Sequence, residues 1–268
     1  KEKYNALKEK HLGILKGHAK VDFDIKAEEQ KWFESIEKIK ELKTIDCEYY
    51  VNQALKEGKH ILAEGAQGSM LDIDFGTYPY VTSSNTITAG VCTGLGIAPQ
   101  HIGEVIGIAK AYCTRVGSGP FPTELHDDTG EKLRQFGHEF GATTGRPRRC
   151  GWTDLPQLKY TIMINGVTQL VITKLDVLDE FETIQYCDRY EIEGNETDRL
   201  PYDLNMEGIH PKFKEVEGWN TSIDWVTKYN DLPEQAQNYI DTLEEELGTN
   251  ISMVSTGPER RKLLMRIH

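Results

Sequence analysis

Hydrophobic and polar positions follow a helical spacing in the first part of the chain. Charged side chains surround Leu, Ile, Ala and aromatic positions over residues 27–43 and 47–57, which predicts two helices, the second ending at Gly58. Residues 60–63 (His-Ile-Leu-Ala) then form a short apolar run that fits a buried strand. We therefore expect a helical subregion over residues 1–58, followed by a strand.

The middle of the chain loses this periodicity. Over residues 64–100, Gly, Ser, Thr, Asn and Asp dominate, and a stretch of this length without regular structure is usually functional. Apolar residues return at helical spacing over residues 103–112, which predicts a helix. Residues 114–154 are again rich in Gly, Thr, Pro and Arg. We therefore interpret residues 64–100 as a functional region without regular secondary structure.

The last hundred residues alternate between strand and helix patterns. Residues 169–173 and 183–192 fit strands, residues 233–247 form an amphipathic helix, and residues 251–254 fit a last short strand. Such alternation favours the α/β class.

Composition and charge narrow the class of protein. The chain has 268 residues, 38% hydrophobic and 28% charged, which is ordinary for a folded protein with one large domain or two small ones. The formal net charge of −12 argues against a nucleic-acid partner, because such proteins usually carry a basic face. The five cysteines form no C-x-x-C pair, so neither a zinc site nor a disulfide framework is indicated. With no membrane-length apolar run and no secretory signal, we expect a cytoplasmic protein without a membrane partner.

The start at Lys1, inside a charged helix-like stretch, suggests a fragment or a processed chain.

A first polar segment combines glycines with a single amide. It reads Glu-Gly-Ala-Gln-Gly over residues 64–68 and continues through the Gly-, Thr- and Ser-rich residues 71–85. Glycines let backbone N–H groups approach an anion, and the Gln67 amide can both donate and accept hydrogen bonds. A chain of turns whose polar side chains satisfy one another is the alternative.

A second segment concentrates positive charge. Arg146, Arg148 and Arg149 follow two threonines within residues 141–152. The guanidinium fork binds carboxylate or phosphate in a bidentate manner, and an isolated basic loop in an acidic protein favours an anion site over a solvated turn. By contrast, His126 beside two aspartates is interpreted as part of a surface loop.

The third segment, Thr173-Lys-Leu-Asp176, follows a predicted strand. Ligands bind at the carboxyl ends of strands in open α/β sheets. A carboxylate there can accept two N–H bonds from one edge of guanine, whereas adenine lacks that pair of donors. The Lys174 stem can lie over the base. The alternative is an ordinary strand end with a solvent-facing ion pair.

Taken together, these segments resemble adenylosuccinate synthetase, a family that joins aspartate to IMP with GTP. The motifs are E-G-A-Q-G at 64–68, D-I-D-F-G-T-Y-P-Y-V-T-S-S-N at 72–85, G-V-C-T-G-L-G at 90–96, T-R-V-G-S-G-P-F-P-T-E-L at 114–125, G-A-T-T-G-R-P-R-R at 141–149, T-K-L-D-V-L-D at 173–179 and S-T-G-P at 255–258. The resemblance covers essentially this whole chain but only the C-terminal part of a family member. It implies a mixed, mostly parallel central sheet flanked by helices, related to P-loop NTPases and incomplete here at the N-terminus.

The resemblance also implies a reaction and a set of residue roles. GTP phosphorylates the 6-oxygen of IMP, and the aspartate amine then displaces that phosphate. Gln67 is the implied catalytic residue, because it stabilises charge on the 6-oxygen. The implied IMP-binding residues are Gln67, Thr82, Val116 and Arg146; those for aspartate are Thr143, Thr144 and Arg146; those for GTP are Arg148, Lys174, Leu175, Asp176, Ser255, Thr256 and Gly257.

Some elements of the family are missing from this sequence. Family members begin with a Gly-rich phosphate loop carrying a catalytic Asp and Lys, followed by a catalytic His and by an Arg that reaches the partner subunit's IMP. We therefore expect Mg²⁺ ligands to lie in the missing segment and none in this chain, a homodimer as the complete form, and no activity from this chain alone. The alternative is a non-catalytic nucleotide-binding or regulatory fragment of the same family. An unrelated P-loop GTPase is disfavoured, since no G-x-x-x-x-G-K-[ST] motif occurs.

Overall fold

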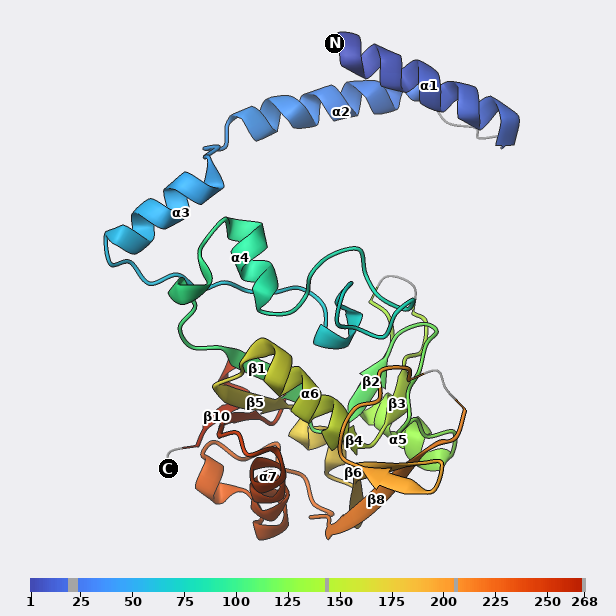
Figure 1. Ribbon diagram of the computed structural model, residues 1–268, viewed down its shortest axis with the longest axis vertical. Coiled ribbons are helices and arrows are strands. Elements are labelled where there is room, and N and C mark those ends of the chain that lie inside the picture. Colours follow the sequence, from blue (N-terminus) through green and yellow to red (C-terminus); the bar gives the residue numbers. More distant parts are fainter. Residues whose placement is uncertain (19–23, 143–144, 205–206, 267–268) are drawn as a thin grey trace. The chain divides into compact units, whose positions relative to one another are not determined.

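Two compact units make up the structure. The computed structural model describes residues 1–18, 24–142, 145–204 and 207–266. The first unit comprises residues 1–50 and the second residues 51–268 (Figure 1). The first unit is helical, whereas the second holds all of the strands that the structure describes.

A small aromatic cluster holds the helices of the first unit together. These helices are α1 (Glu2–His18) and α2 (Ile25–Lys40). The rings of Tyr4 and Trp32 stack with their centroids 4.9 Å apart. The Asp24 carboxylate begins α2 by accepting two backbone N–H bonds, at 2.9 and 3.2 Å. This is the usual way of satisfying the free donors of a first helical turn.

The helices expected over residues 27–43 and 47–57 are present as α2 and α3 (Cys47–Lys56). Gly58 follows α3 with φ +72°, a conformation that glycine adopts without strain. The strand expected over residues 60–63 is wrong, because this segment pairs with no strand that the structure describes. Its apolar side chains are exposed, Leu62 to 91%. An apolar run becomes a strand only where a neighbour completes the hydrogen-bond ladder.

The first sheet is mostly parallel. Its strands are β1 (Ile106–Lys110), β5 (Gln169–Thr173), β9 (Ile251–Ser255) and β10 (Leu263–Met265). They lie in the order β1-β5-β9-β10, with β1, β5 and β9 parallel and β10 antiparallel to β9. The strands expected at 169–173 and 251–254 are therefore confirmed. Parallel pairing places the carboxyl ends of β1, β5 and β9 at one edge of the sheet.

The helix expected over residues 103–112 is wrong, because this segment contains strand β1. Ile106 and Ile108 are exposed to 45% and 76%, whereas Gly107, between them, faces the sheet. A Cβ on Gly107 would lie 2.8 Å from the Leu170 side chain of β5. The period of two was hidden because both faces of this edge strand carry apolar residues.

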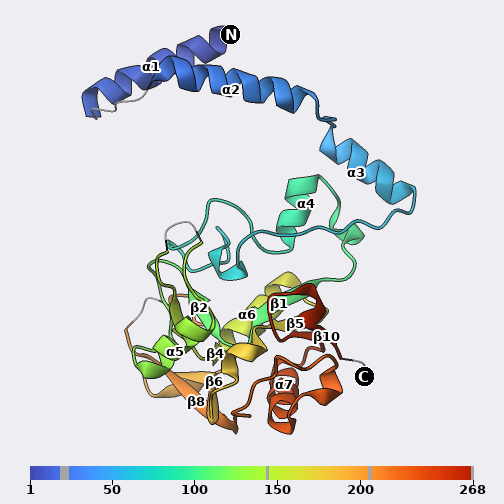
Figure 2. The same ribbon diagram turned by 180° about the vertical axis from the view of Figure 1, so that it is seen from behind.

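Two further sheets complete the second unit (Figure 2). One contains β4 (Thr153–Asp154), β6 (Thr183–Ile192), β7 (Asn195–Thr197) and β8 (Ile209–Glu217). In it β6 is parallel to β4 and antiparallel to both β7 and β8, and it confirms the strand expected at 183–192. The other is the antiparallel pair β2 (Cys113–Arg115) and β3 (Arg149–Gly151).

Helix α4 (Ala89–Leu95) lies apart from these strands, whereas three other helices pack against them (Figures 1 and 2). These three are α5 (Asp128–Phe136), α6 (Leu155–Asn165) and α7 (Glu234–Leu247). The last one confirms the amphipathic pattern at 233–247. One buried cluster, which includes Ile172 of β5, Leu155 of α6 and Tyr239 of α7, joins helices and sheets. The α/β class with a mixed, mostly parallel sheet is thus confirmed. None of the described helices is long and apolar enough to cross a membrane.

Candidate functional site

The loop over residues 68–88 is organised by a carboxylate. Asp72 is fully buried, and its two oxygens accept backbone N–H bonds from Asp74 (2.9 Å), Phe75 (3.1 Å), Thr86 (2.7 Å) and Ile87 (3.2 Å). Burial opposes the charge, but these four donors hold the pKa of Asp72 below its ordinary value. Asp72 therefore fixes both ends of the loop.

Gln67 and Thr82 both belong to this polar region. Gln67 is exposed and has φ +69°, which is uncommon for a residue with a side chain. The Thr86 hydroxyl donates to the carbonyl of Gly68 at 2.9 Å and so ties the segment beside Gln67 to the far end of the loop. The backbone N–H of Thr82 donates to Leu71 O at 2.8 Å. The Gln67 amide and the half-buried Thr82 thus lie on a loop that its own hydrogen bonds hold in shape.

Arg115 joins this loop to the segment that carries Val116. Its guanidinium donates to the Thr77 hydroxyl (3.1 Å), to Tyr80 O (3.3 Å) and to Ser118 O (3.1 Å). Val116, exposed to 67%, lies beside it. Two predicted IMP-binding segments that are far apart in sequence are therefore connected by a residue that sequence reasoning did not single out.

The three arginines of the basic loop differ in what they contact. Arg149 forms a bidentate pair with Glu124, with 2.8 Å between Nε and Oε1, and it also donates to the carbonyls of Gly117 (3.2 Å) and Gly119 (2.8 Å). The chain itself thus satisfies Arg149. Arg146 is exposed. The guanidinium of Arg149 is therefore committed to contacts within the chain.

Predicted aspartate-binding residues are only partly covered by the structure. Thr143 and Thr144 lie outside the described residues. Arg146 accepts at its carbonyl a hydrogen bond from Gly141 N at 2.9 Å, so the described parts of this loop are closed on themselves.

Arg148 belongs to a buried cluster around Glu139, which is fully buried. Arg148 Nη1 lies 2.7 Å from Glu139 Oε2, and the other carboxylate oxygen contacts Lys110 Nζ (2.6 Å), the Tyr112 hydroxyl (2.6 Å) and Lys174 Nζ (3.3 Å). Burial alone would raise the pKa of Glu139, but the hydrogen bonds from Lys110 and Tyr112 lower it to about 2. Sequence reasoning missed Glu139 and Lys110.

The turn after β5 places the predicted guanine-binding residues. Lys174 adopts φ +61°, and its ammonium is directed to Glu139 and to the carbonyl of Gly137. Leu175 is fully buried in the core, so only its backbone can contact a ligand. Asp176 follows in the 3-10 turn Leu175–Leu178.

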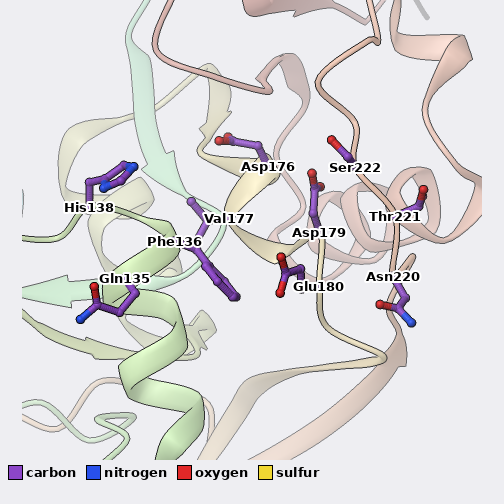
Figure 3. Close-up of a pocket in the computed structure, with 10 residues that line it drawn as sticks. All are labelled: Gln135, Phe136, His138, Asp176, Val177, Asp179, Glu180, Asn220, Thr221 and Ser222. Atoms are coloured by element: carbon purple, nitrogen blue, oxygen red, sulfur yellow. The ribbon is translucent and has the colours of Figure 1, made fainter.

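A pocket of about 430 Å³ opens beside Asp176 (Figure 3). Its lining comes from the end of α5 and the following turn, from the turn after β5, and from the segment after β8: Gln135, Phe136, His138, Asp176, Val177, Asp179, Glu180, Asn220, Thr221 and Ser222. Oδ1 of Asp176 is buried and has no hydrogen-bond partner among the residues that the structure describes. Burial raises the pKa of Asp176 above its ordinary value.

A second carboxylate of this pocket is also perturbed. Burial raises the pKa of Asp179 to about 6, although Trp219 Nε1 (2.8 Å) and the backbone N–H of Ile223 (3.0 Å) donate to it. Asp179 thus holds the segment after β8 against the turn after β5.

The segment after β9 contributes the remaining predicted GTP-binding residues. The Ser255 hydroxyl donates to Gly257 O at 2.7 Å, and the backbone N–H of the buried Thr256 donates to Lys262 O at 3.0 Å. Because β9 is the parallel neighbour of β5, this segment and Lys174–Asp176 lie at the same edge of the sheet. The structure brings the predicted GTP-binding segments together, while their role stays a prediction.

A metal-ligand cluster is absent from the described part of the chain. Its His, Cys, Asp and Glu residues form no group of three or more that could hold a metal ion. His126 is exposed to 81%, as expected for a surface loop.

Loops that gather at the carboxyl ends of parallel strands beside a pocket are typical of ligand-binding sites in α/β proteins. The family model described as adenylosuccinate synthetase matches residues 1–264. The chain belongs to the adenylosuccinate synthetase family, as its motifs predicted.

Similar proteins agree with this assignment. The chain is 54% identical over 265 residues to the adenylosuccinate synthetases of Phocaeicola vulgatus and of Parabacteroides distasonis, matches that cover 99% of this chain. It spans 62% of the length of these curated relatives. Among solved structures, the fully ligated adenylosuccinate synthetase from Plasmodium falciparum superposes with a TM-score of 0.90 at 38% identity, over 98% of this chain and 62% of that one. The cyanophage S-2L succinoaminodeoxyadenylate synthetase, at 19% identity and a TM-score of 0.53, shows a similar fold.

Proposed function

We propose that this chain supplies the base-binding and substrate-binding loops of a GTP-dependent ligase of AMP biosynthesis. The reaction joins L-aspartate to IMP and gives adenylosuccinate, GDP and phosphate. Family membership supports the proposal, and the observation that carries it is the unpartnered carboxylate oxygen of Asp176 beside the pocket.

The argument for guanine rests on unmet hydrogen-bonding capacity. A buried acceptor without a partner costs free energy, and a ligand with N–H donors removes that cost. Guanine offers two neighbouring donors, N1–H and the 2-amino group, whereas adenine offers no such pair. Donors from the base also stabilise the ionised form of Asp176, whose pKa burial raises. A pocket of about 430 Å³ has room for a base.

The loops with Gln67, Thr82, Val116 and Arg146 take IMP in this proposal. The γ-phosphoryl group of GTP bonds to the 6-oxygen of IMP as its bond to GDP breaks, and IMP gives up its N1 proton. The amine of aspartate then attacks C6, and phosphate departs with that oxygen. Gln67, held at a left-handed backbone position, donates a hydrogen bond to the 6-oxygen as negative charge develops. Arg146, with Thr143 and Thr144, binds the aspartate carboxylates.

Magnesium, a homodimer and a cytoplasmic location complete the proposal as properties of the family. Mg²⁺ prefers carboxylate and phosphate oxygens. Among the described residues, His, Cys, Asp and Glu form no group of three or more that could hold a metal ion.

The experiment compares this chain with a completed chain, in which it is joined to the part of the Phocaeicola vulgatus synthetase that it does not match. With IMP, GTP, aspartate and Mg²⁺, the completed chain should form adenylosuccinate, followed by its ultraviolet absorbance, at about 1 per second or faster. The 268-residue chain alone should be inactive, because phosphoryl transfer needs a phosphate cradle, and this sequence has no P-loop motif.

Two outcomes would contradict this proposal. A folded completed chain that binds GDP yet forms no adenylosuccinate would favour a non-catalytic nucleotide-binding role. Turnover by the 268-residue chain alone would show that other residues perform the chemistry.

A further inference from the structure

One buried carboxylate contacts cations from three segments of the candidate site. Glu139 contacts Lys110 at the carboxyl end of β1, Arg148 in the basic loop and Lys174 at the carboxyl end of β5. The side chains of these cations keep exposed fractions of 26%, 32% and 36%, whereas Glu139 has none. Glu139 is therefore out of reach of any substrate, but each cation retains a face toward solvent.

The turn that carries Glu139 packs closely against the Tyr112 hydroxyl. His138 adopts φ +48°, and a Cβ on Gly137 would lie 2.2 Å from the Tyr112 hydroxyl. Only glycine leaves room for that hydroxyl, which donates to Glu139 at 2.6 Å. The carbonyl of the same Gly137 accepts a hydrogen bond from Lys174. The turn thus fixes Glu139 and Lys174 together.

The cluster carries more positive than negative charge. Three cations face one carboxylate, and Arg148 Nε is buried without a hydrogen-bond partner among the residues that the structure covers. Burial lowers the pKa of Lys110, and the neighbouring Lys174 and Arg148 lower it further, against the effect of Glu139. Such an excess is stabilised when an anion binds. A nucleotide phosphate supplies that anion in the proposed reaction.

We propose that Glu139 is a positioning residue that holds Arg148 and Lys174 in their binding geometry and so links the aspartate loop to the guanine pocket. The proposal rests on the proposed function. Arg148 shares its loop with Arg146, and Lys174 is two residues from Asp176. When Glu139 loses its charge, neither the Arg148 side chain nor the Lys174 side chain is held in its binding geometry.

The test compares Glu139→Gln with a matched control, Glu191→Gln, in the completed chain. Glu191 lies on β6 and pairs with Lys212, away from the Glu139 cluster. Glu139→Gln should raise the KM for GTP and for aspartate at least about tenfold each, the loss expected for charge-assisted hydrogen bonds. The KM for IMP should change less, because three of its four predicted contacts lie on other loops. The control should leave all three KM values unchanged. If Glu139→Gln lowers only the amount of folded enzyme and leaves these KM values at wild type, Glu139 is merely structural.

A double-mutant cycle tests whether Glu139 acts through Arg148. In an Arg148→Met background, Glu139→Gln should add much less to the KM for GTP than it does alone. Additive effects would overturn the proposal. If Glu139→Gln does not fold, Tyr112→Phe takes its place, since it removes one donor and keeps every charge. A rise of about fivefold in the KM for GTP is then expected, and an unchanged KM would overturn the proposal.

Calorimetric titration with GDP separates this proposal from the proposed function. If the wild-type completed chain binds GDP but makes no adenylosuccinate, only the reaction is refuted. GDP affinity of the same variants then decides the role of Glu139: a loss of about tenfold in Glu139→Gln supports it, and equal affinity overturns it.

Discussion

Two aspartates on different loops of the second unit, Asp72 fully buried and Asp176 half-buried, have opposite surroundings. Asp72 accepts four backbone N–H bonds from its own loop, and its pKa is lowered. Asp176 has a buried oxygen without a partner in the described structure, and its pKa is raised. A carboxylate that the chain satisfies holds the fold together, whereas one that the chain leaves unsatisfied suits a ligand. The two loops should therefore respond differently to the same substitution.

The largest expected effect on stability is the loss in Asp72→Asn. The new amide would face backbone donors and leave two of them buried without an acceptor, at a cost of about 3 kcal/mol. Chemical denaturation of the 268-residue chain measures this change. Asp74→Asn is the matched control, because Asp74 is exposed and pairs with Asn85, so its effect should stay below about 1 kcal/mol. Equal losses in both variants would contradict the role given to Asp72.

A pH effect of intermediate size is expected at Asp179. Its folded-state pKa, about 6, exceeds the ordinary value for Asp, so the folded state binds more protons than the unfolded state between these two values. The contribution of Asp179 to stability should therefore fall as pH rises from about 4 to about 6, by on the order of 2 kcal/mol. Denaturation midpoints across this range, compared between wild type and Asp179→Asn, measure it. Parallel profiles would show that Asp179 titrates normally.

The basic loop offers a second comparison. Arg149 is held by Glu124 and two carbonyls, so Arg149→Leu should mainly reduce stability. Arg146→Leu should raise the KM for aspartate in the completed chain at least tenfold, about 1.4 kcal/mol. Both aspartate and IMP must be titrated, since Arg146 is predicted to contact both. If neither KM nor kcat changes, the loop does not bind substrate.

The smallest expected effect is on the stability of Asp176→Asn. Since the chain gives its buried Oδ1 no partner, the substitution removes no hydrogen bond within the chain at that atom. We expect the free energy of unfolding to change by less than about 1 kcal/mol, in contrast to Asp72→Asn. A loss as large as that of Asp72→Asn would mean that Asp176 is structural.

The sequence predicted the elements whose patterns are complete by themselves. Strands β5 and β9 are short and largely apolar, β6 is a longer strand that alternates buried and more exposed positions over much of its length, and α7 has a clear apolar face. The hydrophobic pattern gave a wrong element where neighbouring segments determine the secondary structure. Residues 60–63 have no partner strand in the described structure, and β1 is an edge strand of the described sheet with exposed isoleucines. Local periodicity carries no information on which neighbours a segment acquires.

The sequence likewise identified some residues of the candidate site and missed others. Asp176 and Arg148 follow from motifs that are contiguous in sequence. Arg115 and Glu139 were missed, because their contacts lie far along the chain: Arg115 reaches Thr77 across 38 positions, and Glu139 reaches Lys110 across 29. Spacing reveals residues that share a loop, whereas residues that hold different loops together become visible only in the fold.

The most direct test of the central claim is the preference for GTP over XTP in the completed chain with Asp176→Asn. Xanthine presents a carbonyl where guanine has its 2-amino group, so an Asn amide suits xanthine and repels guanine. The account predicts a loss of about 2–4 kcal/mol in kcat/KM for GTP and a rise in activity with XTP relative to GTP. An unchanged ratio of the two kcat/KM values would show that Asp176 does not bind the base.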